Sequence, residues 1–193
     1  MNRIANNIKN RLSLRPPQAE SLEILCKLGD VLSLKKNPDL EKELRKVNEL
    51  YPTCRDFERN FPNLCFALAT GVGKTRLMGA FIAYLYLAKG IKNFFVLAPN
   101  LTVYNKLIAD FSDINSPKYV FQGIGELTTQ APFIITGDNY DHRRLASHMF
   151  PFIVNIFNIS KINAETRGGR APKIKRLSEV LGESYFNYLA NLD

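Results

Sequence analysis

The chain has 193 residues, of which 46% are hydrophobic and 23% are charged, and its formal net charge is +8. The length fits one domain of ordinary size, and the apolar content is typical of a globular protein. Residues 1–17 lack the apolar core of a signal peptide and no run reaches membrane-spanning length, so we expect a cytoplasmic protein. The three cysteines have no metal-ligand spacing, which favours free thiols in a reducing compartment. The basic excess indicates a polyanionic partner, either nucleic acid or anionic lipid.

Apolar periodicity and turn residues predict the order of the secondary-structure elements. The predicted elements are helices over 17–34 and 40–51, the second capped by Asp39; a strand over 64–69; a helix from 74; a strand over 93–99; a helix over 101–111; shorter strands over 118–124 and 132–137; a strand over 151–159; and helices over 174–181 and 183–189. Strands that alternate with helices predict an α/β fold with a mostly parallel sheet. We expect an N-terminal helical segment over 1–60 and a second domain over 61–193.

A glycine-rich turn lies between the predicted strand over 64–69 and the helix that follows it. Gly71 and Gly73 let the backbone turn sharply and approach a ligand, and backbone N–H groups at the start of a helix attract an anion. We expect Lys74 to reach the β- and γ-phosphates of a nucleotide and the Thr75 hydroxyl to bind Mg²⁺, which makes these two the catalytic candidates. Leu68 stands where the strict phosphate-loop pattern has glycine, so a plain turn is the alternative. The strand before the turn and the helix after it favour phosphate binding, with contacts from Thr70, Gly71, Val72, Gly73, Lys74, Thr75 and Arg76.

An acidic residue that helps to hold Mg²⁺ is harder to find in this sequence. Hydrolysis at a phosphate loop needs an Asp, commonly followed by Glu, at the end of a buried strand. The dipeptide Asp-Glu does not occur, and the first candidate is Asp138, which follows the predicted strand over 132–137. Because Gly137 precedes it and Asn139 follows it, this position is first of all typical of a turn.

Basic residues are concentrated near the C-terminal end of the chain. The run from 161 to 176 contains a single acid, Glu165, and its two glycines and one proline indicate a loop. A solvated loop without a partner is one interpretation, and a contact with nucleic-acid phosphates is the other. The basic residues of this run are Lys161, Arg167, Arg170, Lys173, Lys175 and Arg176.

Four segments together resemble a known family. "ATGVGKT" (69–75) resembles motif I of superfamily-two helicases, and "LRPPQAESLEIL" (14–25) resembles the adenine-reading element of restriction-type helicases. "FVLAPNLTVYNKL" (95–107) resembles motif Ia, and "VNIFNISKIN" (154–163) resembles the equivalent segment of the Res subunit of type III restriction enzymes. The order of the segments indicates the N-terminal part of a DEAD/DEAH-type helicase similar to that subunit.

The resemblance implies a partial RecA-like P-loop domain that uses ATP and Mg²⁺ in an ATP-dependent DNA helicase or translocase. Gln18 is expected to read adenine, because an amide can donate and accept at its edge. The implied partners are double-stranded DNA, which is tracked or unwound, and a methyltransferase (modification) subunit, with no membrane. The residues expected to contact DNA are Asn100, Thr102, Asn158 and Lys161, together with the basic run.

Two departures from the family pattern matter for activity. The distance from Gln18 to Gly71 is longer than in compact helicases, and a helical insertion over 36–60 fills it. The family's acidic metal-site strand is expected just after the closing helix, where this sequence stops, so we expect residues 1–193 to be truncated before it and to bind nucleotide without hydrolysing it. A non-catalytic nucleic-acid-binding protein with a vestigial nucleotide site is an alternative, and a P-loop kinase is a weaker one.

Overall fold

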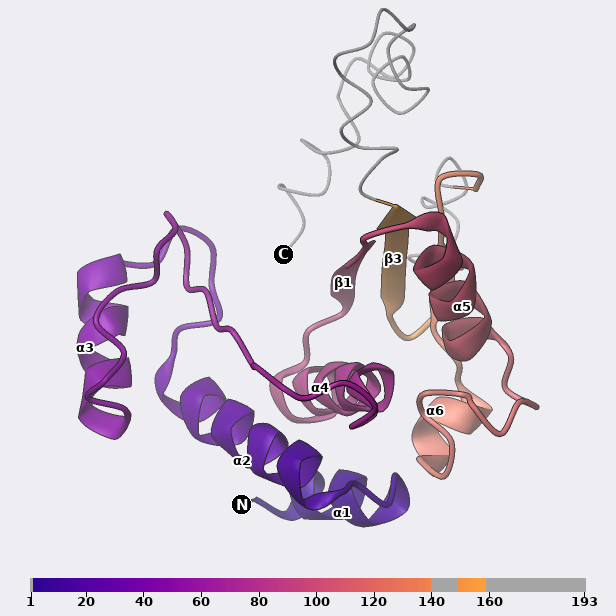
Figure 1. Ribbon diagram of the computed structural model, residues 1–193, viewed down its shortest axis with the longest axis horizontal. Coiled ribbons are helices and arrows are strands. Elements are labelled where there is room, and N and C mark those ends of the chain that lie inside the picture. The colour runs from indigo at the N-terminus through magenta and orange to yellow at the C-terminus, as the bar shows by residue number, and fades with distance from the viewer. Residues whose placement is uncertain (1, 140–148, 159–193) are drawn as a thin grey trace, which may run out of the picture. The chain divides into compact units, whose positions relative to one another are not determined.

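A computed structural model describes residues 2–139 and 149–158, and the description below is limited to them (Figure 1). The chain forms two compact units, Met1–Gly90 and Ile91–Asp193. The phosphate loop and the helix after it therefore group with the N-terminal helices, whereas the predicted domain boundary lies earlier, between residues 60 and 61. The two helices predicted over 174–181 and 183–189 lie outside the described residues.

The first unit is helical throughout its regular structure. Its helices are α1 (Arg3–Arg11), α2 (Pro16–Val31), α3 (Leu40–Leu50) and α4 (Lys74–Lys89). Helices α1 and α2 pack against each other and against α4, while α3 contacts α2 (Figure 1). The predicted helices over 17–34 and 40–51 are confirmed with small shifts of their ends.

The helix ends in this unit follow simple capping chemistry. The Asp39 side chain caps α3 by accepting from the N–H of Lys42, as predicted. Pro16 begins α2, where its missing N–H costs no helical hydrogen bond. Gly90 ends α4 in the left-handed region, at φ +71°.

Helix α1 was not predicted from the sequence. Its buried residues Ala5 and Ile8, followed by Leu12 at the end of the helix, recur at helical spacing and form the apolar side that packs on α2 and α4. Asn2 caps the helix, since its side-chain oxygen accepts from the N–H of Ala5 at 2.9 Å. The pattern and the cap were both readable, although the stretch contains many asparagines and few apolar residues.

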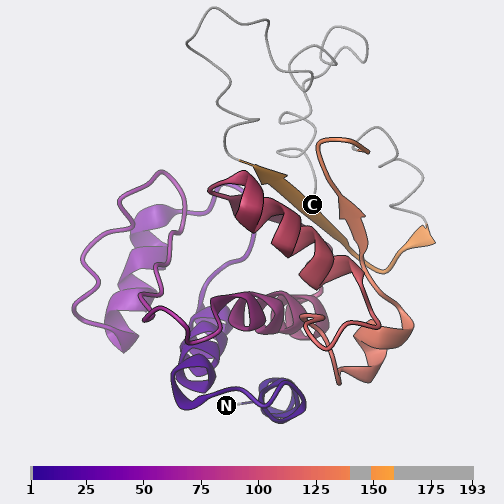
Figure 2. The same ribbon diagram turned by 45° about the vertical axis from the view of Figure 1, so that its right-hand side comes forward.

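The second unit contains a small parallel sheet. Its strands are β1 (Asn93–Ala98), β2 (Phe133–Ile135) and β3 (Ile153–Asn158), in the order β1-β3-β2. Both neighbours run parallel to β3, which is buried along its whole length as a central strand should be. Helix α5 (Leu101–Ser112) packs on all three strands, and the short helix α6 is Gly125–Thr129 (Figure 2). The parallel sheet and its helices confirm the predicted α/β class of a partial RecA-like domain.

Two strand predictions are wrong. Residues 64–69 belong to no helix, and no strand ladder includes them in the described part of the chain. Leu64, Phe66 and Leu68 are partly buried, and the residues between them are exposed. The apolar run that predicts a strand is therefore present without the paired neighbour that a strand requires. Residues 118–124 form consecutive turns instead, because the N–H of Tyr119 donates to Ser116 O at 3.0 Å and similar bonds follow. The aromatic residues there are buried as core side chains on turns.

Candidate nucleotide-binding site

The glycine-rich loop has the backbone conformation that its glycines allow. Gly71 has φ +81° and Gly73 has φ +91°, both in the left-handed region that side chains disfavour. Gly73 is the N-cap of α4, and no side chain caps this helix start. A Cβ at Gly71 would meet nothing within 4 Å, so the loop is open at this point. An open glycine loop at an uncapped helix N-terminus can accept an anion through its backbone N–H groups.

The two catalytic candidates lie at the first turn of α4. Lys74 is exposed, and its Nζ donates to the carbonyl oxygen of Ala69 at 3.1 Å, across the loop. This bond places the ammonium group beside the loop, where a phosphate oxygen could replace the Ala69 carbonyl as its hydrogen-bond acceptor. Thr75 is half-buried in the same turn. A lysine, a threonine and a helix start therefore lie together, which fits the groups that a phosphate and its Mg²⁺ require.

Gln18 contacts this loop directly. The Gln18 side chain is 2% exposed; its Nε2 donates to Gly73 O at 2.8 Å, and its Oε1 accepts from Arg15 N at 2.8 Å. These partners fix the orientation of the amide, since one is an acceptor and the other a donor. An amide has two N–H donors and two acceptor lone pairs, so one of each remains for a base. Because the Gln18 side chain is only 2% exposed, a base could reach these groups only if the side chain became accessible, and adenine reading by Gln18 stays a prediction.

Two arginines connect the loop and the first turn of α4 to other parts of the first unit. Arg15 Nη1 donates to Gly71 O at 3.2 Å, a contact that sequence reasoning missed although Arg15 stands in the same segment as Gln18. Arg76 Nη1 donates to Leu12 O at 2.9 Å, which ties the first turn of α4 to the end of α1. The guanidinium of Arg76 is thus engaged with protein backbone, and its predicted nucleotide contact stays a prediction. The other loop residues, Thr70 and Val72, lie in the turn before α4.

Comparison with known proteins decides the family. The family model for the type III restriction enzyme res subunit matches residues 11–189. The chain belongs to this family. No curated protein and no solved structure matches the chain significantly. We call the family the Res family below. It is a family of helicase-type ATP-binding domains, which generally use ATP and Mg²⁺, and the match includes both the Gln18 segment and the phosphate loop.

Asp138, the first candidate for the Res-family metal-site acid, lies in a turn. Its N–H donates to Thr136 Oγ1 at 3.3 Å, and Asn139 Oδ1 accepts from the N–H of Thr136 at 2.7 Å. Asp138 is exposed. Among residues 2–139 and 149–158, no group of three or more His, Cys, Asp and Glu side chains is placed to hold a metal ion. The turn predicted from the glycine and asparagine around Asp138 is therefore present.

The residues predicted to contact DNA have different surroundings. Asn100 is exposed and caps α5 by accepting from the N–H of Val103 at 2.9 Å, and Thr102 is exposed in the first turn. Asn158 is the last residue of β3 and is only 3% exposed, so a phosphate contact would require this side chain to become accessible. Their roles stay predictions. The predicted contacts that lie outside the described residues are Lys161, Arg167, Arg170, Lys173, Lys175 and Arg176.

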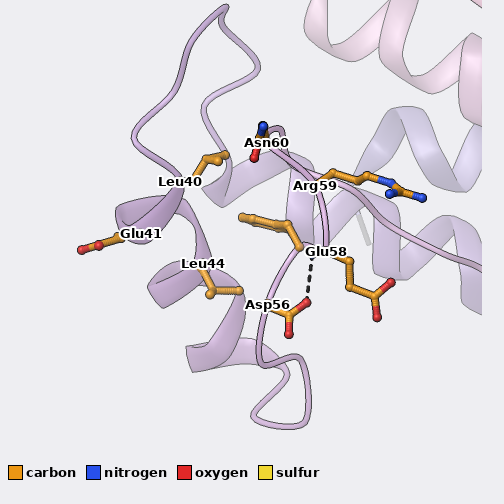
Figure 3. Close-up of a pocket in the computed structure, with 8 residues that line it drawn as sticks. Leu40, Glu41, Leu44, Asp56, Glu58, Arg59 and Asn60 are labelled. Atoms are coloured by element: carbon orange, nitrogen blue, oxygen red, sulfur yellow. Dashed lines mark hydrogen bonds between the residues drawn. The ribbon is translucent and has the colours of Figure 1, made fainter.

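A cavity of about 350 Å³ lies on α3 and the loop after it, within the helical insertion. Leu40, Leu44 and the buried Phe57 supply its apolar lining. Figure 3 shows the Glu58 and Arg59 side chains directed away from α3. Asp56 accepts from the N–H of Glu58 at 2.9 Å, which shapes this turn. None of the residues predicted to contact nucleotide lines this cavity.

In the part of the chain that the structure describes, no helix is both long enough and apolar enough to cross a membrane.

Proposed function

We propose that this chain is the ATP-binding part of an ATP-dependent DNA helicase or translocase of restriction type. The observation that carries the proposal is the bond from Gln18 to Gly73 O, because it brings the segment expected to read adenine onto the loop expected to hold phosphates. The open backbone at Gly71 and the lysine across the loop fit the phosphate groups of ATP. Membership of the Res family supports the same assignment.

The roles of the individual residues follow from their positions. The N–H groups at the start of α4 and the ammonium of Lys74 bind the phosphates, and the Thr75 hydroxyl provides one ligand for Mg²⁺. The remaining N–H and lone pair of Gln18 bind the adenine edge. When bound, Mg²⁺ neutralises phosphate charge and orients the terminal phosphate. DNA is contacted by Asn100 and Thr102 and by the basic residues after β3.

The test of this function separates binding from turnover. We expect the 193-residue chain to bind ATP and to release phosphate no faster than its Lys74→Ala variant, because no Asp-Glu pair is present to orient the metal and the attacking water. The measurement is steady-state phosphate release with Mg²⁺, with and without double-stranded DNA. Sustained turnover that depends on Lys74 would contradict the expectation and would direct attention to Asp138 as the acid.

A second candidate function is a non-catalytic nucleic-acid-binding protein with a vestigial nucleotide site. The specific observation that favours it is the same lack of an Asp-Glu pair in the sequence. DNA binding that is unchanged by saturating ATP or ADP would support this candidate, whereas a nucleotide-dependent change in DNA affinity would support the motor.

A further inference from the structure

Two carbonyl oxygens of the glycine-rich loop accept hydrogen bonds from the segment that begins α2. Arg15 Nη1 donates to Gly71 O at 3.2 Å, and Gln18 Nε2 donates to Gly73 O at 2.8 Å. All four residues belong to the first compact unit. The two carbonyls lie on either side of Val72 in the sequence, so the backbone around this residue is oriented by two contacts from outside the loop.

The orientation of a carbonyl fixes the orientation of the N–H that follows it. Because the peptide is trans and planar, the C=O of one residue and the N–H of the next point in opposite directions. The bond from Arg15 to Gly71 O therefore turns the Val72 N–H away from the guanidinium. Among the residues that the structure describes, none accepts a hydrogen bond from this N–H. Such a donor, next to a helix start that no side chain caps, is a group that an anion can bind.

The loop has little of its own to hold this orientation. Gly71 is exposed at φ +81°, and a Cβ built on it would meet nothing within 4 Å. Glycine adopts several backbone conformations at little cost. A conformation that turns the Gly71–Val72 peptide over replaces the N–H with a carbonyl oxygen, which repels a phosphate. A contact that holds the Gly71 carbonyl in place therefore favours anion binding, because the loop is ordered before the ligand arrives.

The backbone of Arg15 is fixed by its neighbours. Its N–H donates to Gln18 Oε1 at 2.8 Å, and the Gln18 side chain is 2% exposed. Pro16 and Pro17 follow, and proline restricts both its own backbone and that of the residue before it. A guanidinium is always charged, so its bond to a carbonyl is stronger than a bond from a neutral donor. Arg15 thus reaches Gly71 from a fixed point.

We propose that Arg15 is a positioning residue for the anion site of the glycine-rich loop. It holds the Gly71–Val72 peptide so that the Val72 N–H is presented to a phosphate oxygen, and it acts through the loop without touching the ligand itself. The inference rests on the proposed function, because it takes phosphate to bind at this loop. It adds a role that is separate from adenine reading by Gln18 and from the attraction of phosphate by Lys74.

The experiment uses inorganic tripolyphosphate with Mg²⁺, which has no base for Gln18 to read. Calorimetric titration measures its affinity for the 193-residue chain, and NMR order parameters of the loop amides, measured without ligand, report whether the loop is rigid on the ps–ns timescale. The test variant is Arg15→Ala. The matched control is Arg59→Ala, which removes an exposed arginine from the same unit. Thermal unfolding checks that both variants fold, and Arg15→Gln replaces the alanine variant if that one does not.

We expect Arg15→Ala to bind tripolyphosphate roughly three- to tenfold more weakly than wild type, which is the loss expected for one hydrogen bond. In the ligand-free chain, the order parameter of the Val72 amide should fall from the value of rigid backbone, about 0.85, towards the value of flexible backbone, below about 0.6. Arg59→Ala should leave both quantities at their wild-type values.

Three results would overturn the proposal. Weaker tripolyphosphate binding with an unchanged order parameter would show that Arg15 contacts phosphate directly. A mobile loop with unchanged affinity would show that loop order does not serve anion binding, and no change in either quantity would show that Arg15 contributes nothing to the site. Lys74→Ala separates the two levels of the account: if it binds tripolyphosphate as tightly as wild type, the proposed function fails together with the inference. A loss of affinity in Lys74→Ala but not in Arg15→Ala would overturn the inference alone.

Discussion

The side-chain nitrogen of Gln18 lies 2.8 Å from the carbonyl oxygen of Gly73, although the two residues are 55 positions apart in the chain. The bond joins the start of α2 to the N-cap residue of α4. A Cβ built on Gly73 would lie 2.7 Å from the same nitrogen. Glycine is thus required there twice, by its positive φ and by the closeness of the amide.

Replacing Gly73 by alanine is expected to cost more stability than replacing Gly90, which also has a positive φ. The left-handed conformation costs about 1–2 kcal/mol at either position. Gly73→Ala must in addition displace Gln18 from a bonded, buried position, which adds about 1–3 kcal/mol. A Cβ at Gly90 would meet nothing within 4 Å. Chemical denaturation of the two variants measures the difference, and equal free energies of unfolding would show that the Gln18 contact contributes nothing.

Gln18 is expected to give the site a preference for adenine. Its remaining donor and acceptor fit the adenine edge, and guanine would leave them unpaired or opposed. The wild-type chain should bind ATP more tightly than GTP, and Gln18→Ala should weaken ATP binding more than GTP binding. Competition against a fluorescent nucleotide provides both affinities. If the wild type binds ATP and GTP equally well, Gln18 does not read the base.

Arg76 is expected to act on the structure and to contribute little through direct contact with nucleotide. Its bond to Leu12 O ties α4 to the end of α1, and hydrogen bonds from charged groups contribute about 1.5–3 kcal/mol. Arg76→Ala should therefore lower the melting temperature in the absence of any ligand. Arg59→Ala, on an exposed loop of the same unit, serves as the control. An unchanged melting temperature together with weakened ATP binding would show that Arg76 is a nucleotide ligand after all.

Glu43 makes part of the stability of the first unit depend on pH. Burial works to raise the pKa of this carboxyl, but hydrogen bonds from Lys46 Nζ and Ser33 N, each 2.7 Å long, leave the pKa below its ordinary value. A lowered carboxyl pKa contributes stability that is present above the unfolded-state pKa and is lost as pH falls through the folded-state pKa.

Glu43→Gln should consequently destabilise the chain at pH 7 by about 1–3 kcal/mol, because Ser33 N and Lys46 Nζ lose the charged carboxylate that accepts their hydrogen bonds. The difference from wild type should shrink as the pH falls from the ordinary carboxyl pKa through the lowered pKa of the folded-state Glu43 carboxyl, because the wild-type side chain then loses its charge. Thermal unfolding at a series of acidic pH values measures this. A difference that stays constant throughout the acidic range in which the chain remains folded would mean that the charge on Glu43 does not stabilise the fold.

Sequence alone predicted the parts of the chain whose structure is set locally. The start of α4 after Gly73, the cap at Asp39 and the strands β1 and β3 follow from turn chemistry, capping and apolar runs, and they are present. The apolar run of β1 is typical of a buried strand, but Phe95 and Leu97 are exposed. Residues 64–69 show the limit of this reasoning. A strand needs a neighbouring strand to pair with, and an apolar run alone does not indicate whether such a neighbour is present.

The candidate site was predicted less completely than the fold around it. The motif located Lys74 and Thr75, but the bond from Arg15 to Gly71 and the one from Arg76 to Leu12 join positions more than fifty residues apart. No spacing rule connects such positions, since their contact depends on how α1, α2 and α4 pack. Helix α1 was missed for a different reason. Its apolar pattern, Ala5, Ile8 and Leu12, is regular but short, and most of the residues between these positions are asparagine or basic.

The most direct test of the central claim is a calorimetric titration of the 193-residue chain with ATP and Mg²⁺. We expect Lys74→Ala to lose charge-assisted contacts with the phosphates, worth about 1.5–3 kcal/mol, and so to bind roughly ten- to hundredfold more weakly. Lys42→Ala, an exposed lysine on α3, should bind like wild type. Equal ATP affinity of wild type and Lys74→Ala, with both folded, would contradict the assignment of this loop as the nucleotide site.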